Sequence, residues 1–313
     1  MKNFKQILKE TNEITFIIGN GFNRYISQAP SWRDVLINVA NKCNIDTSNL
    51  NNFLFSSGLS YPEMFSIIEA IHDNPENKFI NEKSTISLRK EIANFLLNKE
   101  NLDCLDCKLV KYLNNAKANI ITTNFDFNLE FELYKKPNLH KTDLTINQSS
   151  IYYYLFQYFG DENGPKVWHI HGHCKRPSSL RLSLSNYTCT LDYIKKKLFA
   201  NNVGEHISPK KLDGWVGVNS CLGQFFANKK LVIIGCGLDS QEILLRELLI
   251  YKYRSWMNGA IPMGYYLCTK EEIKKDPSKQ CFFNALNIQV VEFDNYDEIY
   301  NGDFWTVNNG NDF

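Results

Sequence analysis

Short apolar runs rich in β-branched residues recur along this chain, and they constrain its fold more than any other feature. Several end abruptly in Gly, Asn or His, as do buried parallel strands that lead into active-site loops. The expected strands cover Ile14 to Ile18, Ala118 to Thr122, Lys166 to Ile170, Leu231 to Ile234, Met263 to Cys268 and Ile288 to Phe293. Helical spacing of apolar residues separates them, for example over Trp32 to Cys43 and Gln241 to Trp256. We therefore expect an α/β fold, with a Rossmann-like parallel sheet and helices on both faces.

The first two expected strands are about a hundred residues apart, far more than one crossover helix requires. Helical patterns over Tyr61 to Ile71 and Ser87 to Leu97 fall in this interval. We expect a helical insertion at about 44–117, beside the ligand cleft. Because no internal repeat or linker divides the chain, residues 1–313 are interpreted as one domain.

Charge and cysteine content narrow the classes of function and location. Lys plus Arg total 35 against 34 for Asp plus Glu, so no overall positive field attracts nucleic acid. The lysine runs Lys195 to Lys197 and Lys210 to Lys211 are interpreted as solvated faces. Nine irregularly spaced cysteines are typical of a reducing compartment. With neither a signal-peptide pattern at the start nor an apolar run of ~18 residues, we expect a cytoplasmic protein without a membrane partner.

The first chemical motif is Gly19-Asn20-Gly21-Phe22-Asn23, which follows a strand and precedes a helix expected near Ser31. Glycines at such a point let backbone N–H groups approach a phosphate, and the helix terminus adds a positive dipole. The same pair of glycines also makes an ordinary tight turn. Arg24 occupies the sixth position, where the dinucleotide fingerprint of dehydrogenases has glycine, which disfavours a hydride-transfer enzyme.

The second motif, Thr122-Thr123-Asn124-Phe125-Asp126, places hydroxyl, amide and carboxylate groups just past a strand. Open α/β sheets bind ligands at this edge, where such groups can hold ribose hydroxyls and a carboxamide. Alternatively, Asn124 and Asp126 only cap a following helix.

The third motif is Trp168-His169-Ile170-His171-Gly172-His173. A strand that continued through it would put the three histidines on one face, which a metal could use if further ligands were supplied. His169 is interpreted as a core histidine. His171, followed by glycine, is the candidate general base, because imidazole titrates near neutrality.

The fourth motif, Gly235-Cys236-Gly237, follows another strand and could line a nucleotide site. A simple strand-to-helix connection, with Asp239 or Ser240 capping the helix, explains it equally well.

In this order the motifs resemble the sirtuin superfamily, and more closely the divergent sirtuin-like domains of bacterial antiphage defence proteins. The resemblance runs from Ile14 to about Leu248. The sirtuin sequence Gly-Ala-Gly-x-Ser, followed by Gly-Ile-Pro-Asp-Phe-Arg, is matched by residues 19–23 and by Gln28-Ala29-Pro30-Ser31-Trp32-Arg33. Thr-Gln-Asn-x-Asp is matched by residues 122–126, and His-Gly by His171-Gly172. Leu184-Ser185-Asn186-Tyr187 is similar to a segment of the defence-type relatives, and Gly235-Cys236-Gly237 stands where sirtuins have Gly-Thr-Ser.

The resemblance implies roles for these residues. Asn124 would orient water and ribose, Asp126 would bind the nicotinamide carboxamide, and His171 would act as base on a ribose hydroxyl. The remaining substrate-binding residues that it implies are Gly19, Asn20, Gly21, Phe22, Asn23, Trp32, Thr123, Gly235, Cys236 and Gly237.

The cysteines depart from the pattern of deacylase sirtuins, in which two Cys-x-x-Cys pairs after the catalytic histidine bind zinc. Here the pair Cys104 and Cys107 precedes the asparagine motif, and only Cys174, Cys189 and Cys221 follow His171 before the last glycine turn. We therefore expect no metal and no acyl-peptide-binding half.

The leading functional hypothesis is an NAD+ glycohydrolase, which cleaves the nicotinamide–ribose bond and releases nicotinamide and ADP-ribose. The resemblance implies NAD depletion in antiphage defence, regulated by a homo-oligomer or by a defence-system partner protein. Two alternatives are an NAD-dependent protein deacylase and a non-catalytic NAD or ADP-ribose sensor subunit. A metal hydrolase built on the three histidines is the least favoured.

Overall fold

The computed structural model describes residues 2–27, 29–46, 58–74, 87–97, 106–134, 139–141, 150–161, 163–198, 220–238, 242–255 and 262–306. These residues form an eight-stranded sheet in the order β3-β4-β5-β2-β1-β6-β7-β8. The strands are β1 (Ile14–Ile18), β2 (Asn119–Thr122), β3 (Leu139–Lys141), β4 (Gln157–Gly160), β5 (Lys166–His169), β6 (Lys230–Ile234), β7 (Gly264–Thr269) and β8 (Ile288–Phe293). From β5 to β8 every pairing is parallel, whereas β3 and β4 add an antiparallel edge.

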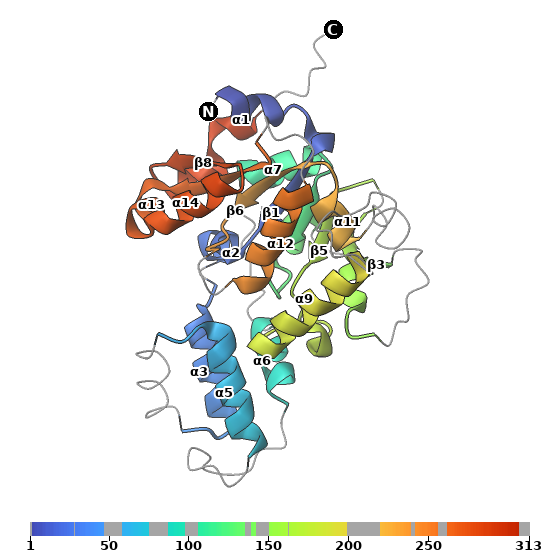
Figure 1. Ribbon diagram of the computed structural model, residues 1–313, viewed down its shortest axis with the longest axis vertical. Coiled ribbons are helices and arrows are strands. Elements are labelled where there is room, and N and C mark those ends of the chain that lie inside the picture. The colour runs from blue at the N-terminus through green and yellow to red at the C-terminus, as the bar shows by residue number, and fades with distance from the viewer. Residues whose placement is uncertain are drawn as a thin grey trace.

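Helices cover both faces of this sheet, which confirms the expected α/β, Rossmann-like fold (Figure 1). Neighbouring residues of one strand point into different cores: Ile17 packs with the cluster under α12, whereas Phe16 and Ile18 pack with the cluster under α7. Since both faces of the sheet are buried, its central strands are continuous apolar runs in the sequence. The helices of the two layers are α1 (Lys2–Ile7), α2 (Asn20–Ser27), α7 (Lys108–Asn115), α8 (Asn128–Tyr134), α9 (Leu184–Leu198), α11 (Cys221–Phe226), α12 (Ile243–Ser255), α13 (Lys270–Lys275), α14 (Pro277–Ala285) and α15 (Tyr296–Asn301).

Three further helices, α3 (Trp32–Lys42), α5 (Tyr61–Asp73) and α6 (Leu88–Leu97), share a separate apolar cluster. Figure 1 shows them at the end of the molecule away from α1. Ser31 is the N-cap of α3 and Ser60 is the N-cap of α5, and each forms a capping box with the carboxylate three residues later. Helices therefore form within the interval where an insertion was expected.

The strand order creates a switch point between β1 and β6. From β1 the chain first builds the sheet on the β2 side and later returns to place β6 on the other side of β1. The end of β1 pairs with the end of β6, Ile18 opposite Ile234, so the loops that follow them diverge from one point. Open α/β sheets bind ligands in the crevice that such diverging loops leave.

The short 3-10 helices are η1 (Thr11–Glu13), η2 (Tyr153–Phe156), η3 (Pro177–Ser179) and η5 (Asp303–Trp305). No helix in the described ranges is long and apolar enough to span a membrane. Lys210, Lys211, Asp239, Ser240 and Cys104 lie outside the described residues.

Candidate functional site

Two glycine turns interlock at the switch point. The Gly19 N–H donates to Ile234 O (3.0 Å), and the Gly21 N–H donates to Gly235 O (2.8 Å). A Cβ atom on Gly19 would lie 2.6 Å from Gly235 O, and one on Gly21 would lie 2.7 Å from Gly235 Cα. These glycines thus permit one turn to contact the other. The N–H groups of both glycines therefore already donate within the protein.

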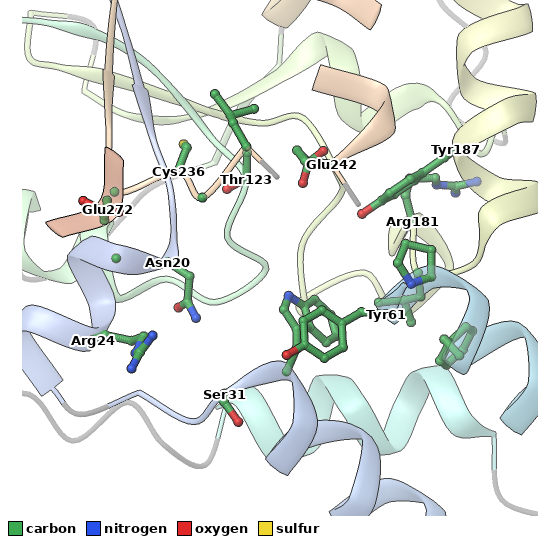
Figure 2. A pocket seen from close by; sticks show the side chains of 18 of the residues that line it. Asn20, Arg24, Ser31, Tyr61, Thr123, Arg181, Tyr187, Cys236, Glu242 and Glu272 are labelled. Carbon is green, nitrogen blue, oxygen red and sulfur yellow. The ribbon is translucent and has the colours of Figure 1, made fainter. Parts of the chain in front are cut away.

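Helix α2 begins at Asn20, immediately after Gly19. It precedes α3, which is the helix expected near Ser31. The Asn20 side chain lines the central cavity (Figure 2). Phe22 is fully buried and packs edge-on against Tyr300, while Asn23 is buried and turned towards Asp126. Gly19, Phe22 and Asn23 are not among the described residues that line the cavity, and their assignment as substrate contacts stays a prediction.

The loop after β2 is tied to β1 through Thr122. Its Oγ1 donates to Ile18 O (2.9 Å) and accepts from the Asn124 N–H (3.1 Å). The Asn124 side chain is 5% exposed, and neither atom of its amide group makes a hydrogen bond within the described part of the chain. A buried, unsatisfied amide that faces a cavity is an open position for a polar ligand.

The Asp126 carboxylate is held by two donors. Asn23 Nδ2 lies 2.8 and 2.7 Å from its two oxygens, and the Asn128 N–H donates to Oδ1 (3.1 Å). Asp126 therefore satisfies the first turn of α8, as the capping alternative supposed, and it also lines the cavity. Burial raises the pKa of Asp126, although the Asn128 N–H opposes the shift, and the nearby Glu130 raises it further.

The histidine motif leaves the sheet at His169, where β5 ends one residue before the expected end at Ile170, so the three histidines do not share a strand face. His169 is buried between Asn124 O (2.7 Å from Nδ1) and Glu130 Oε1 (2.5 Å from Nε2). Burial alone would lower the pKa of His169, but the Glu130 carboxylate raises it above its ordinary value. His169 thus supports the backbone of Asn124, as expected of a core histidine.

His173 packs against the rings of Phe127 and Phe159. Burial, with a smaller contribution from neighbouring His169, lowers the pKa of His173 to about 3, so it is neutral at physiological pH. Its surroundings are apolar and aromatic, which assigns it to packing.

His171 alone of the three histidines lines the cavity. Its side chain is 2% exposed, and neither ring nitrogen has a hydrogen bond among the described residues. The imidazole stacks on Tyr187 (5.2 Å between centroids, 24° between planes), and its Nε2 lies 3.0 Å from Glu242 Oε1. The following Gly172 has φ 83°, a left-handed conformation that favours glycine.

The cavity has two connected parts. The inner part measures about 580 Å³ and the outer part about 1290 Å³, and both volumes include space open to solvent. Asn20, Trp32, Thr123, Tyr187 and Glu242 line both parts. The inner part adds Asn124, Asp126 and His171; the outer part adds Gly21, Gly235, Cys236 and Gly237.

Several lining residues were not predicted as site residues. Figure 2 shows Arg24 and Glu272 on one side of the outer cavity and Arg181 and Glu242 on the other. Glu242, directly before α12, is the most consequential because it is close to His171. No sequence pattern marks a lone glutamate 71 residues away in the chain, and only the fold brings the two side chains together.

Metal ligands are not clustered in the part of the chain that the structure describes: no three His, Cys, Asp or Glu residues there are grouped to hold an ion. Cys174 and Cys221 are buried in different apolar clusters, and Cys189 is exposed. The rings of His169 and His173 lie 5.6 Å apart, whereas His171 lines the cavity, so the described residues do not support the metal-hydrolase alternative.

A family model described as the SIR2-like domain matches residues 118–291, which is more than half of the chain. The match includes Asn124, Asp126, His171 and the Gly235 turn, and it begins after the first glycine turn. No curated protein matches the sequence significantly.

Proposed function

Because this chain belongs to the SIR2-like domain family, whose domains use NAD, we propose that it is an NAD+ glycohydrolase that releases nicotinamide and ADP-ribose. One observation carries the proposal. The inner cavity brings together the Asn124 amide, the Asp126 carboxyl and the His171 imidazole, and the amide and imidazole are buried without hydrogen bonds among the described residues. These unsatisfied groups fit a polar ligand that completes them.

In the proposed reaction the bond between C1′ and nicotinamide breaks, and its electron pair leaves with neutral nicotinamide. The oxocarbenium-like centre that forms is captured by water positioned by Asn124. His171 takes a proton from a ribose hydroxyl, which in turn accepts the proton that water loses, so the net proton reaches solvent through His171. Asp126, held by Asn23, accepts a hydrogen bond from the nicotinamide carboxamide.

The adenylate half of NAD is proposed to lie in the outer cavity. Asn20, Gly237 and Trp32 line it beside the interlocked turns, and the Arg24 guanidinium supplies a positive charge for the diphosphate. Trp32 on α3 and Tyr61 on α5 close the opposite side. On this proposal residues 1–313 are one sirtuin-like domain, with its helical insertion as one wall of the site.

The biological setting is proposed from the resemblance to antiphage defence domains. Uncontrolled NAD hydrolysis would be toxic to the cell, so we propose a cytoplasmic enzyme that an infection signal activates through homo-oligomerisation or a partner protein.

The direct test is nicotinamide release from NAD by purified protein, alone and with lysate of phage-infected cells as activator. We expect release by the wild type, with loss of at least ~100-fold in His171→Ala and Asn124→Ala. His72→Ala, at the far end of α5, serves as the matched histidine control and should not reduce release. Undiminished release by both site variants would refute the proposal.

The same samples separate the alternatives. Consumption of an acyl-lysine peptide in step with NAD would identify a deacylase. Tight binding of NAD without turnover under any activating condition would identify a sensor.

A further inference from the structure

One carboxylate of the cavity, that of Glu242, has no role in the chemistry described above. It lines both the inner and the outer cavity, and its side chain is 22% exposed. Figure 2 shows it between Thr123 and Tyr187, turned towards the cavity. Glu242 Oε1 is buried, lies 3.0 Å from His171 Nε2, and makes no hydrogen bond within the described ranges.

The two groups are held towards each other by separate parts of the fold. On one side, the His171 ring stacks on Tyr187, and the backbone carbonyl of His171 accepts a hydrogen bond from the backbone N–H of Arg181 (2.9 Å). On the other side, Arg246 on α12 donates to Leu238 O (2.9 Å) and fixes the start of the helix that follows Glu242. The close approach is therefore built into the architecture.

Leaving such groups without hydrogen bonds is unfavourable. Among the described residues, buried Glu242 Oε1 and the two buried His171 ring nitrogens make no hydrogen bond that replaces the one lost from water, and Oε1 and Nε2 meet only as an ion-pair contact at 3.0 Å. Groups of this kind are retained where a ligand completes them. The ligand must supply hydrogen-bond donors to the carboxylate, because an ionised carboxylate only accepts.

The position of Glu242 selects the part of the ligand. With nicotinamide beside Asn124 and Asp126 in the inner cavity and the adenylate in the outer one, the ribose that joins them lies at the junction, which Glu242 lines. Its adjacent 2′- and 3′-hydroxyls offer two donors that one carboxylate can accept together. Negative charge at this point also stabilises an oxocarbenium-like transition state.

We propose that Glu242 is a catalytic residue that binds the ribose diol of NAD and, beside His171, stabilises the positive charge that develops at C1′. This assignment rests on the proposed NAD cleavage. Its binding component requires no turnover and can be tested separately.

The binding test compares ADP-ribose with ADP, which lacks the terminal ribose, by calorimetry. Wild-type protein should bind ADP-ribose more tightly than ADP. Glu242→Gln should weaken ADP-ribose binding roughly 10-fold and change ADP binding less than about twofold, because only the diol loses its charged acceptor. Glu247→Gln, which removes a carboxylate from α12, the helix that follows Glu242, and not from the cavity lining, is the matched control.

The kinetic test uses nicotinamide release by the same variants. Glu242→Gln should lower kcat roughly 100-fold with a smaller change in KM, since the carboxylate acts mainly in the transition state. Unfolding temperatures close to wild type would establish that the variants are folded.

Two results would overturn the assignment. One is wild-type protein that binds ADP and ADP-ribose equally or binds neither. The other is a Glu242→Gln variant that keeps both the wild-type preference for ADP-ribose and the wild-type kcat. Absence of NAD cleavage by wild type under every activating condition would instead refute the proposed function, while a diol preference lost in Glu242→Gln would still support the binding role.

Discussion

Replacing Gly172 by alanine tests whether the turn after β5 holds His171 in place. A Cβ atom on Gly172 would lie 2.1 Å from Ser179 O and 2.5 Å from the Ser179 carbonyl carbon. That neighbour is backbone, fully buried, and its oxygen accepts from Arg181 Nε (2.8 Å). It cannot swing aside as a flexible side chain would.

The magnitude follows from the distances. Cβ atoms essentially never approach another atom closer than 3.0 Å, so the chain at Gly172 must move by about 1 Å. The left-handed φ adds about 1 kcal/mol of strain, and the overlap about 1–2 kcal/mol. Because His171 is the adjacent residue, it moves with the turn, and a misplacement of about 1 Å lowers rates roughly 100-fold.

The assay is steady-state nicotinamide release together with thermal unfolding. Gly58→Ala is the matched control: Gly58 also has positive φ (72°), but no atom of the described residues lies within 4 Å of the added Cβ. It should show the backbone strain without loss of activity. If Gly172→Ala kept wild-type kcat, either the turn does not position His171 or His171 does not act on the substrate.

Three further predictions concern buried polar groups that are not in the cavity lining. Glu130→Gln should lower the free energy of unfolding by about 3 kcal/mol in urea titrations, because it removes the charge partner of buried His169. Since the pKa of His169 is raised in the folded state, this loss should be full below the ordinary imidazole pKa near 6.5 and should shrink as pH rises through the folded-state pKa. A loss that does not depend on pH would contradict this. Burial, and secondarily Lys229, lowers the pKa of Lys252 to about 7. Between pH 7 and 10.5 the unfolded chain therefore binds more protons than the folded protein, and the free energy of unfolding of the wild type should rise across that range. Lys252→Met should flatten the rise. Asn23→Ala removes the amide donor from Asp126, whose pKa burial already raises, so the acidic limb of the pH–rate profile should move to higher pH, and an unchanged profile would show that ionised Asp126 is not required.

The parallel core of the sheet was predictable because burial on both faces of a strand requires a continuous run of apolar residues, which is visible in the sequence. The ranges expected for β1 and β8 match the observed strands at both ends, and the helix expected near Ser31 is α3, with Ser31 as its N-cap. The antiparallel strands β3 and β4 were missed. They are short, and β4 (Gln-Tyr-Phe-Gly) has neither a long apolar run nor a clear alternation.

The site was predictable only where its polar residues stand close together in the sequence as a short motif. Asn124, Asp126 and His171 were found by their motifs, and the structure brings them to one cavity. The sequence could not show that the two glycine turns contact each other, with Gly19 and Gly21 packed against Gly235. Glu242 was missed for the same reason: its distance to His171 is a property of the tertiary fold.

The central claim is that NAD binds with its nicotinamide end in the inner cavity and its ribose at His171. A crystal structure of the Asn124→Ala variant with NAD tests this most directly, since slow turnover should preserve the bound substrate. We predict that the carboxamide contacts Asp126 and that a ribose hydroxyl lies within about 3.2 Å of a His171 ring nitrogen. NAD bound with its nicotinamide outside the inner cavity, and its ribose out of reach of His171, would contradict the account.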